Sequence, residues 1–419
     1  MRIYFSGIGG VGIGPLAEIS LDAGYTVAGS DLAESLMTKN LAARKVKVSL
    51  SQSGIFLRNE HKKEAFDWFV YTAALSDDHP ELIAARKLGI KVAKRDEFLA
   101  HIIAEKDLKL IAVAGTHGKT TTTSMMIWAL QQLDIDISYS VGSTLAWGPS
   151  GKFHPKSKFF VYECDEFDRN FLHFSPHLSV TTNIEYDHPD TYRNEQEYFE
   201  AFQQFIRQSE QAILWQQDAA IAKIREPDTW CLQDDEVISL KLAGEHNRRN
   251  GTLVLKALEW LGVGVKKTNS TIIANFPGVN RRFERLAKNL YSDYGHTPTE
   301  IAATLQMVDE LSARIVLVYQ PHQNIRQHEI WKHYSDKIFE KADEIYWLPT
   351  YQSREDPSLE TLTPKQLTKN LTNKSLVTFC EMNDELWSHI QIELHKGKLV
   401  LCMGAGSIDK WLREKVQKS

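Results

Sequence analysis

Short apolar runs alternate along the chain with helical patterns, and several of the runs open into a turn rich in glycine. The first run, Arg2–Phe5, leads into Gly7-Ile-Gly-Gly-Val-Gly12, and a helical pattern that ends at Gly24 precedes a second run at Thr26–Gly29. An apolar run followed by a glycine turn and then a helical period is typical of a strand, a loop and a helix. The pattern therefore predicts an α/β protein.

The same alternation continues through the rest of the sequence. Further strands are predicted over residues 68–74, 90–93, 111–114, 159–163, 178–184, 212–215, 289–293, 313–319 and 398–403, and helices over residues 84–88, 125–130 and 252–260. Aromatic residues also recur at helical spacing between residues 196 and 208, at Tyr198, Phe199, Phe202 and Phe205. That spacing predicts a helix whose aromatic face packs against a core.

Two polar segments, Glu105-Lys-Asp107 and Asn275-Phe-Pro-Gly278, interrupt the alternation and are interpreted as domain boundaries. A chain of 419 residues is long enough for two to four domains. We expect three α/β domains: a Rossmann-like domain over residues 1–105, a central domain over residues 106–275 with a largely parallel sheet and a P-loop-type turn, and a second Rossmann-like domain over residues 276–419.

Composition excludes several classes of protein. Hydrophobic residues make up 42% of the chain, enough to fill cores, and the net charge of -5 with no long basic block argues against binding to nucleic acid. No apolar stretch approaches the roughly 20 residues that a membrane-spanning helix needs. The four cysteines are scattered, and the sequence opens on a strand rather than a signal peptide. A reduced, cytoplasmic protein, monomeric or homodimeric, is expected.

The strongest chemical signal is Gly115-Thr-His-Gly-Lys-Thr-Thr121, between the predicted strand 111–114 and a helix. Its two glycines allow backbone N–H groups to curl inward, and the helix N-terminus adds positive potential. Lys119 adds a full charge and Thr120 a hydroxyl for Mg²⁺. The strict P-loop pattern requires a further glycine where Val113 stands. The turn is nevertheless predicted to hold a triphosphate.

Polar residues also follow the next two predicted strands. Four carboxylates come at the end of strand 159–163: Glu163, Asp165, Glu166 and Asp168. Carboxylates at the carboxyl end of a strand beside a phosphate loop are suited to bind a metal, although a solvated acidic turn has the same pattern. His188 follows strand 178–184 and could bind either a metal or a phosphate.

The first glycine turn has the spacing of a pyrophosphate-binding turn. Gly7, Gly9 and Gly12 permit a close approach of the backbone to phosphate, and Asp31, 19 residues beyond Gly12, can reach a ribose. NAD, FAD and a UDP-sugar all carry a pyrophosphate, so the turn alone does not choose among them. Farther along, Asn247 and Asn250 lie one helical turn apart and could hold an adenine or cap a helix.

Taken together, these motifs resemble the Mur ligases, the ATP-dependent amide-forming enzymes of peptidoglycan precursor synthesis, and within that family the alanine-adding branch. The resemblance covers essentially the whole chain. It rests on Gly7-Ile-Gly-Gly-Val-Gly12, Gly115-Thr-His-Gly-Lys-Thr-Thr-Thr122, Glu163-Cys-Asp-Glu166, Asn183-Ile-Glu-Tyr-Asp-His188, Gly244-Glu-His-Asn247 with Asn250, Arg281-Arg-Phe283, Asp293-Tyr-Gly-His296 and Gln320-Pro-His322.

The resemblance implies a ligase that uses ATP and Mg²⁺ to join L-alanine to the lactyl carboxylate of UDP-N-acetylmuramate through an acyl phosphate. It implies catalytic roles for Lys119, Glu163, His188, Arg281, His322 and Arg326, and metal binding by Thr120, Glu163 and His188. The residues implied to hold ATP are Gly115, Thr116, His117, Gly118, Lys119, Thr120, Thr121, Asn247, Asn250, Arg282, Asp293 and His296. The residues implied to hold the UDP-sugar are Gly7, Gly9, Gly10, Gly12, Asp31 and Thr72.

Three features depart from the family pattern. No lysine lies between His188 and Ala222, whereas several relatives carry a modified lysine after the Asp-His motif, and this absence agrees with the alanine-adding branch. The family's second histidine after Gly295-His296 is replaced by Thr297. Only 57 residues separate Asp187 from Gly244, so part of the edge of the central sheet is expected to be missing.

Alternative functions remain open from the sequence. A recycling ligase that adds a whole tripeptide to UDP-N-acetylmuramate is the nearest alternative to the alanine-adding ligase. Gln320-Pro-His322 and Arg326 favour the amino-acid branch. A nucleotide-binding protein that has lost ligation would explain Thr297 and the short central domain. A nicotinamide oxidoreductase would explain the first glycine turn but not the second.

Overall fold

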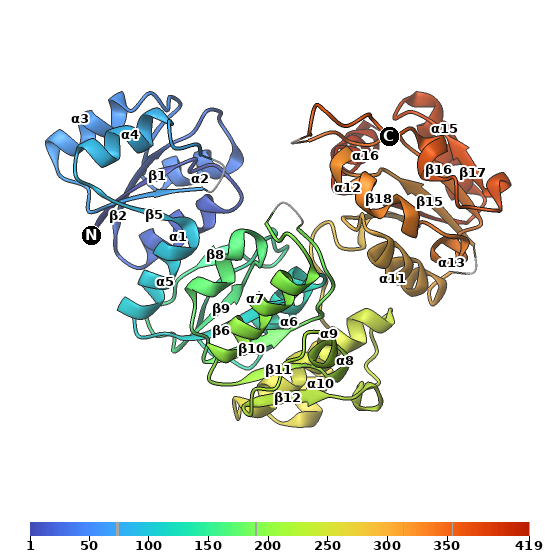
Figure 1. Ribbon diagram of the computed structural model, residues 1–419, viewed down its shortest axis with the longest axis horizontal. Helices are drawn as coiled ribbons and strands as arrows, with labels where there is room; N and C mark the ends of the chain where they lie inside the picture. The colour runs from blue at the N-terminus through green and yellow to red at the C-terminus, as the bar shows by residue number, and fades with distance from the viewer. Residues whose placement is uncertain (73–74, 189–190, 313, 354, 419) are drawn as a thin grey trace. The chain divides into compact units, whose positions relative to one another are not determined.

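The computed structural model describes residues 1–72, 75–188, 191–312, 314–353 and 355–418, and these residues form three β-sheets flanked by helices (Figure 1). The chain divides into two compact units, one of residues 1–238 with 250–276 and the other of residues 239–249 with 277–419. The first unit contains two of the sheets and the second unit contains the third. The expected α/β fold is confirmed, whereas the domain ranges 1–105, 106–275 and 276–419 stay a prediction.

The first sheet is parallel, with strand order β3-β2-β1-β4-β5. Its strands are β1 (Arg2–Ser6), β2 (Thr26–Ser30), β3 (Lys47–Ser49), β4 (Trp68–Tyr71) and β5 (Lys91–Lys94). Its helices are α1 (Ile13–Asp22), α2 (Leu36–Ala43), α3 (Ile55–Lys63), α4 (Pro80–Lys87) and α5 (Arg95–Glu105). Successive side chains of a strand point to opposite faces. Accordingly Phe5 packs in one core with residues of α1, α2 and α5, and Tyr4 packs in another with residues of α3 and α4.

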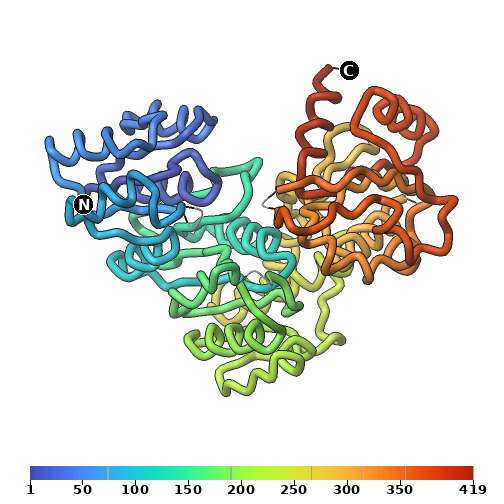
Figure 2. Tube along the Cα trace, turned by 45° about the horizontal axis from the view of Figure 1, so that its top comes forward, coloured from blue at the N-terminus to red at the C-terminus, as the bar shows by residue number. Residues whose placement is uncertain are grey.

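The second sheet has the order β12-β11-β10-β6-β9-β7-β8, and β7 pairs with β8 antiparallel while the other described pairs are parallel. Its strands are β6 (Lys109–Ala114), β7 (Ile137–Ser140), β8 (Gly151–Lys152), β9 (Phe159–Glu163), β10 (Leu178–Thr181), β11 (Ala212–Trp215) and β12 (Thr229–Leu232). The expected largely parallel central sheet is therefore confirmed. Figure 2 follows the path of the chain through it.

Helices and short 3-10 turns connect the strands of the second sheet. They are α6 (Lys119–Gln132), η1 (Phe167–His173), α7 (Glu195–Arg207), α8 (Gln216–Ile221), η2 (Asp234–Glu236), α9 (Glu245–Trp260) and α10 (Lys266–Ala274). In the short segment between Asp187 and Gly244, β12 extends the parallel sheet beyond β11. The expected loss of part of the sheet's edge stays a prediction.

The third sheet has the order β13-β14-β18-β15-β16-β17, with an antiparallel pair at β13 and β14 and parallel pairs elsewhere. Its strands are β13 (Glu284–Ala287), β14 (Leu290–Asp293), β15 (Ile315–Tyr319), β16 (Glu344–Trp347), β17 (Val377–Phe379) and β18 (Leu399–Met403). The connecting segments are α11 (Pro298–Asp309), α12 (Asn324–Ile330), η3 (Trp331–His333), α13 (Asp336–Phe339), α14 (Pro364–Leu367), η4 (Lys374–Leu376), α15 (Asp384–His395) and α16 (Ile408–Lys418). Leu317 packs in a core with α11 and α13, and Val318 packs in another with α15 and α16.

Several expected elements differ from the observed ones at their ends. The strand expected over residues 178–184 ends at Thr181, and the side chains of the next two residues, Thr182 and Asn183, donate to the His117 carbonyl of the glycine turn after β6. The helix expected over residues 84–88 begins earlier, at Pro80, where the ring of His79 accepts a hydrogen bond from the Glu81 N–H. Two ends of expected strands, residues 73–74 and residue 313, lie outside the described residues.

The aromatic face of α7 is confirmed as a core face. Tyr198, Phe202 and Phe205 are fully buried, and Phe199 packs at the margin of the same core. The ring of Phe205 stacks on Phe171 of η1 with centroids 4.8 Å apart. These contacts fix α7 and η1 together beside the second sheet.

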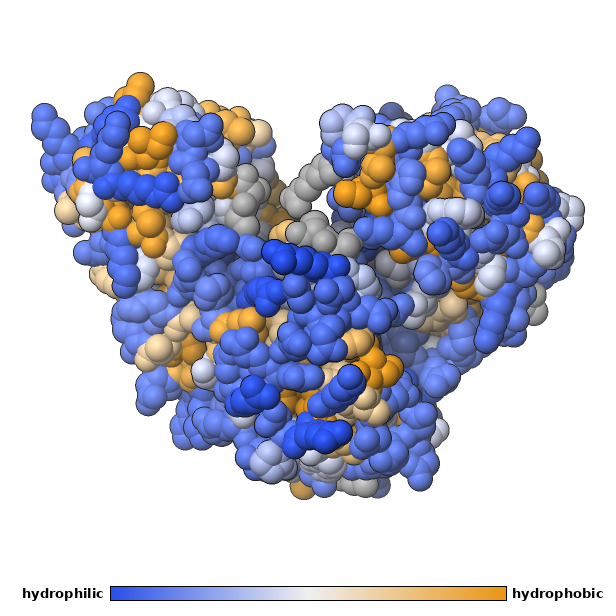
Figure 3. All heavy atoms as spheres, in the orientation of Figure 1, coloured by the Kyte–Doolittle hydropathy of each residue, from blue (hydrophilic) through white to orange (hydrophobic). Residues whose placement is uncertain are grey.

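Hydrophilic residues cover most of the face shown in Figure 3, and apolar residues form small separate groups on it. Within the described part of the chain, no helix combines the length and the apolar composition that crossing a membrane would require.

The buried face of α7 leads to a test of stability. Replacing Phe202 by alanine removes a fully buried ring, and we expect the free energy of unfolding of the first unit to fall by about 3–5 kcal/mol. Glu200→Ala, on the exposed side of the same helix, is the matched control and should change it by less than about 0.5 kcal/mol. Urea unfolding followed by circular dichroism measures both, and equal effects would contradict the assignment of the core face.

Candidate functional site

The glycine turn after β6 has a backbone that other residues cannot adopt without strain. Gly115 has a φ of 126°, and a β-carbon there would lie 2.2 Å from the Thr182 hydroxyl oxygen. Gly118 has a φ of 79° and is the N-cap of α6. Glycine is the residue that reaches such angles without a steric penalty. The turn therefore ends at the N-terminus of a helix, as the sequence predicted.

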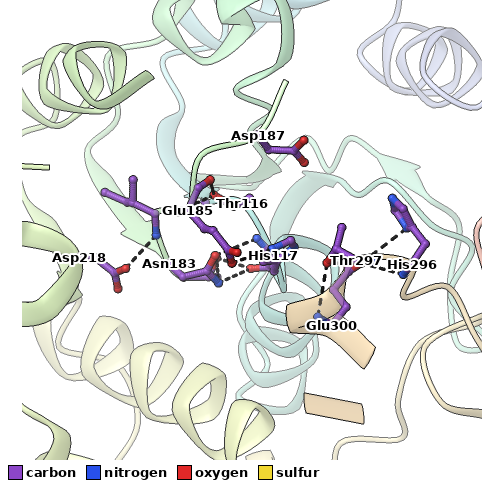
Figure 4. A network of polar contacts seen from close by, with 12 residues as sticks. Thr116, His117, Asn183, Glu185, Asp187, Asp218, His296, Thr297 and Glu300 are labelled. Atoms are coloured by element: carbon purple, nitrogen blue, oxygen red, sulfur yellow. Dashed lines mark hydrogen bonds and ion pairs between the residues drawn. The ribbon is translucent and has the colours of Figure 1, made fainter. Parts of the chain in front are cut away.

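Residues that follow β10 hold this turn in place, as Figure 4 shows. The His117 N–H donates to the Asn183 side chain at 3.0 Å, and the Asn183 amide donates back to the His117 carbonyl at 2.9 Å. The Thr116 hydroxyl donates to the Glu185 carbonyl at 2.7 Å and lies 2.8 Å from the Tyr198 hydroxyl. Two adjacent parallel strands, β6 and β10, thus fix the turn from both sides.

Lys119, the first residue of α6, lies under the turn and is largely buried. Its ammonium donates to the Gly115 carbonyl at 2.7 Å and to both oxygens of Glu166 at 2.8 and 2.9 Å. The Glu166 side chain is fully buried, and that of Lys119 is 14% exposed. Glu166 was noted in the sequence only as one member of an acidic cluster, and the structure makes it the partner of Lys119.

Lys119 and Glu166 are both held in their charged forms. Burial opposes the charge of Lys119, but Glu166 and the neighbouring carboxylates outweigh burial and raise the lysine pKa. Burial likewise opposes the charge of Glu166, yet Lys119 and His188 hold its pKa below the usual range. Burial and the neighbouring Glu166 raise the pKa of Asp165.

Glu163, the last residue of β9, contacts the helix after the glycine turn. One carboxylate oxygen accepts a hydrogen bond from the Thr120 hydroxyl at 2.8 Å, and the other accepts one from the Gly142 N–H at 2.7 Å. Thr120 and Glu163, two of the predicted metal ligands, are therefore brought together. Thr121 lies beside Thr120 in the first turn of α6.

The third predicted metal ligand, His188, contacts different carboxylates. Its Nε2 lies 3.5 Å from Glu166 and 3.9 Å from Asp187. One ligand atom from each of Asp165, Glu166 and His188 lies within 4.8 Å of the others. Carboxylate oxygens and an imidazole nitrogen can bind a divalent cation. The two carboxylates suit Mg²⁺, and the structure groups His188 with Asp165 and Glu166, two members of the acidic cluster that the sequence marked as suited to a metal.

The first glycine turn lies at the carboxyl end of β1. Gly7 has a φ of 78°, and a β-carbon there would be 3.4 Å from the Thr72 methyl group. The Asp31 carboxylate accepts a hydrogen bond from the Gly9 N–H at 2.8 Å. The structure thus brings together the residues predicted to hold a UDP-sugar, and it gives Asp31 a contact with the turn itself.

A cavity of about 140 Å³ joins the two glycine-turn regions of the first unit. Its lining includes Gly12 and Arg95, and also Lys119, Glu163 and Asp165. Groups able to bind anions and groups able to bind a cation therefore line the same cavity.

The two predicted adenine ligands lie on α9 but make different contacts. The amide nitrogen of Asn250 would be 3.1 Å from a β-carbon at Gly118, so Asn250 lies against the glycine turn after β6. The Asn247 amide donates to the Ala243 carbonyl at 3.0 Å and contacts the Met307 sulfur at 3.2 Å. Neither role predicted from the sequence is tested by these contacts.

In the second unit, three predicted residues form one cluster. His296 Nε2 lies 3.2 Å from Arg326 Nη1, and the His296 and His322 rings meet edge to face at 5.3 Å. The other side of His322 stacks on Tyr351 at 5.7 Å. The sequence had not indicated Tyr351, because no motif surrounds it.

The remaining predicted residues of the second unit surround Tyr294. The guanidinium groups of Arg281 and Arg282 lie 4.8 and 4.9 Å from the centre of its ring. Asp293 is buried and accepts hydrogen bonds from the Phe283 and Gly295 N–H groups at 2.8 and 2.7 Å. Burial raises the pKa of Asp293, and Arg282 works against that rise.

Thr297, which stands where the resembling family has a histidine, has a local structural role. It is the N-cap of α11, and its hydroxyl accepts a hydrogen bond from the Glu300 N–H while the Glu300 carboxylate accepts one from the Thr297 N–H. This is a capping box, which stabilises the start of a helix. The position is thus used to begin α11.

Comparison with known proteins gives similarity along the whole chain. Residues 2–107 match the catalytic domain of the Mur ligase family, residues 113–230 match the Mur ligase middle domain, and residues 281–406 match the Mur ligase glutamate ligase domain. The chain is 31% identical over 453 residues to the UDP-N-acetylmuramate–L-alanine ligase of Carboxydothermus hydrogenoformans, with 98% of this chain and 95% of the relative covered.

Solved structures give the same picture of the fold. The UDP-N-acetylmuramate–alanine ligase of Thermotoga maritima has a TM-score of 0.76 and 25% identity, and the match covers 100% of this chain and 99% of that one. A murein peptide ligase of Psychrobacter arcticus has a TM-score of 0.65 and 22% identity, with 100% and 98% covered. At that identity, the second likeness concerns the fold alone.

His322 leads to a test of pH dependence. Burial lowers the pKa of His322 to about 4. The positive charges of His296, Arg326 and Arg281 act in the same direction, and the negative charge of Glu355 opposes them. An unfolded histidine has a pKa of about 6.5. The unfolded chain therefore binds more protons between these values, so this contribution to stability is present above about pH 6.5 and is lost as the pH falls toward about 4.

We expect His322→Asn, which cannot titrate in this range, to lose less stability than the wild type when the pH falls through that window. Urea midpoints measured at several pH values test this. His333→Asn, whose side chain is exposed, is the control and should follow the wild type. A His322→Asn profile parallel to that of the wild type would contradict a lowered pKa in the folded state.

Proposed function

This chain belongs to the Mur ligase family, and we propose that it joins L-alanine to the lactyl carboxylate of UDP-N-acetylmuramate with consumption of ATP. Membership makes the chain an ATP-dependent ligase of peptidoglycan synthesis. The observation that carries the finer proposal is 31% identity over 98% of this chain to an enzyme named for that reaction. The contacts of Lys119 and Glu163 are suited to phosphoryl transfer from ATP, the first step of that reaction.

Formation of an amide requires the substrate carboxylate to be activated. In the proposed reaction the γ-phosphoryl group of ATP passes to the lactyl carboxylate, and the amine of L-alanine then displaces phosphate from the resulting acyl phosphate. Most of the catalytic effect in phosphoryl transfer comes from positioned positive charge. Lys119 supplies such a charge, held in place by Glu166 and the Gly115 carbonyl.

Mg²⁺, when bound, neutralises phosphate charge in such reactions. Thr120 and Glu163 form one candidate set of ligands for it, and Asp165, Glu166 and His188 form another. The turn from Gly115 to Gly118 would direct backbone N–H groups to the phosphates, and Asn250 lies against it. These assignments rest on the chemistry of the donors together with family membership.

The remaining substrates are assigned to the first glycine turn and to the cluster of the second unit. The turn from Gly7 to Gly12 would receive the UDP pyrophosphate. Arg281 and Arg326 would bind the carboxylate of the amino acid. His322, kept neutral by its lowered pKa of about 4, would line this site without adding positive charge to that of the arginines.

A tripeptide-recycling ligase is the second candidate. The Psychrobacter arcticus murein peptide ligase shares the fold over the full chain, and this likeness leaves the choice between the two acceptors to experiment. A family member without ligase activity is less favoured, because Lys119 still pairs with Glu166, Thr120 still pairs with Glu163, and Thr297 has a role as a helix cap.

The proposed reaction uses cytoplasmic nucleotide substrates, and four free cysteines agree with a reducing compartment.

The choice of substrate can be tested directly. We expect phosphate release from ATP to require UDP-N-acetylmuramate and L-alanine together, and the product to be the L-alanyl derivative by mass spectrometry. The screen includes glycine, L-serine and the tripeptide L-alanyl-D-glutamyl-diaminopimelate. A preference for the tripeptide over L-alanine would replace the proposal by its second candidate, and no release with any acceptor would contradict both.

Lys119 can be tested by substitution. Lys119→Ala should lower kcat by about 1000-fold or more, because the charge that stabilises the transferring phosphoryl group is lost. Removal of the lysine also leaves Glu166 buried without its main partner, so thermal unfolding is measured alongside, and Lys119→Met with Glu166→Gln provides a neutral version of the pair. Lys156→Ala, an exposed lysine of the same unit, is the control. Ligation at the wild-type rate in a folded variant would remove Lys119 from the mechanism.

A further inference from the structure

Arg95, the first residue of α5, lines the cavity that separates the first glycine turn from Lys119 and Glu163. None of the sequence motifs contains it. Its side chain is 29% exposed, so the cation is neither at the surface nor sealed in the core. The cavity itself is part of the proposed substrate site, and the role of Arg95 in it follows from the contacts below.

One end of the Arg95 side chain is fixed. Its Nε and Nη2 donate to the two oxygens of Asp96 at 3.0 and 3.1 Å, in a bidentate arrangement. The Asp96 side chain is 3% exposed, and the Tyr162 hydroxyl of β9 also donates to it. A planar guanidinium held at two nitrogens has a fixed orientation. Nη1 is therefore presented to the cavity without being needed for the ion pair with Asp96.

Nη1 lies against the N-terminus of α1. A β-carbon at Gly12, the N-cap of α1, would be 2.9 Å from it. Among the residues that the structure describes, none accepts a hydrogen bond from Arg95 Nη1 or from the N–H groups of Val11 and Gly12. The Gly9 N–H, by contrast, already donates to Asp31. Donors converge at this place without an acceptor.

Asp96 balances the charge of Arg95, but in the described part of the chain it leaves Nη1 and the N–H groups of Val11 and Gly12 without an acceptor. The N-terminus of a helix carries partial positive charge, and a guanidinium beside it is repelled. Two carboxylates also line the cavity: Glu163 binds Thr120 and Gly142, and Asp165 acts on Arg95 through its charge. The positive charge at Gly12 is thus available to a ligand that carries negative charge of its own.

We propose that Arg95 binds the pyrophosphate of the UDP-sugar, donating from Nη1 to one phosphate while the N–H groups at the start of α1 bind the other. This rests on the proposed function, because it takes the UDP-sugar as the ligand of the first glycine turn. Asp96 and Tyr162 position the guanidinium. Since Tyr162 precedes Glu163 on β9, the same contacts join the pyrophosphate site to the strand that carries Glu163.

The test compares ligands that differ only in their phosphates, on the full chain. Isothermal titration measures the binding of uridine, UMP, UDP and UDP-N-acetylmuramate. The variants are Arg95→Lys, and Arg95→Met with Asp96→Asn, which removes both charges and keeps an amide beside Tyr162. Arg86→Met, an exposed arginine of the same domain that pairs with Asp77, is the matched control. Thermal unfolding establishes that each variant is folded.

We expect the Arg95→Met, Asp96→Asn variant to bind UDP about 10- to 100-fold more weakly than the wild type, as the loss of a charged hydrogen bond predicts, with uridine binding unchanged. Arg95→Lys should also weaken UDP, because one ammonium cannot replace the fork. The KM for UDP-N-acetylmuramate should rise more than kcat falls. The control should match the wild type throughout.

Four other outcomes overturn the proposal in distinguishable ways. Unchanged UDP binding in folded Arg95 variants, with wild-type ligation intact, would exclude the pyrophosphate contact and leave the proposed function standing. Equal weakening of uridine and UDP would show that Arg95 acts only through the shape of the domain. UDP-N-acetylmuramate weakened with UDP unchanged would assign Arg95 to the lactyl carboxylate. A wild-type chain that binds no UDP would remove the proposed function as well.

Discussion

The buried ion pair between Lys119 and Glu166 determines the geometry of the phosphate turn. A carboxylate that is fully withdrawn from water costs several kcal/mol unless a cation and hydrogen-bond donors compensate it. Both oxygens of Glu166 meet the Lys119 ammonium, and the same ammonium donates to the Gly115 carbonyl. The lysine therefore connects the acidic segment after β9 to the glycine turn after β6. Loss of either charge would leave the other buried and unbalanced.

This pairing is possible because three strands lie side by side. In the second sheet β10, β6 and β9 are adjacent and parallel, so the segments that follow them emerge at one edge. The glycine turn and Lys119 follow β6, the cluster from Glu163 to Glu166 follows β9, and Asn183 and His188 follow β10. Chain segments far apart in sequence thus supply the phosphate turn, its counter-charge and its support.

Much of this arrangement could be predicted from the sequence, because each element leaves a local pattern. Apolar runs, glycine turns and helical spacing located β6, β9 and α6, and the polar residues at strand ends indicated where chemistry would gather. What the sequence could not give was the choice of partners within the edge. His188 was grouped with Glu163, whereas its contacts are with Glu166 and Asp187, and which carboxylate pairs with which cation depends on side-chain packing that no local pattern encodes.

Two residues, Thr297 and Arg95, show which contacts a local sequence pattern does and does not encode. Thr297 was interpreted as a departure, but it makes a capping box with Glu300, which the sequence Thr297-Pro-Thr-Glu300 itself encodes. Arg95 carries no motif signal, since a helix that begins with arginine has no special spacing. Its position beside Gly12 arises only when α5 packs against the first sheet and Tyr162 meets Asp96.

The charges around the cavity of the first unit explain why a substrate with two anionic ends would suit it. Arg95 and Lys119 line the cavity as separate cations, each fixed by its own carboxylate, Asp96 or Glu166. Glu163 and Asp165 also line it, so a substrate carboxylate that approached them would be repelled in the absence of a further positive charge. A divalent cation held by these carboxylates would reverse the local sign. The acidic residues therefore oppose a substrate carboxylate in this cavity unless a cation such as the Mg²⁺ of the proposed reaction compensates them, whereas Arg95, positioned by Asp96 and Tyr162, already offers positive charge to a pyrophosphate.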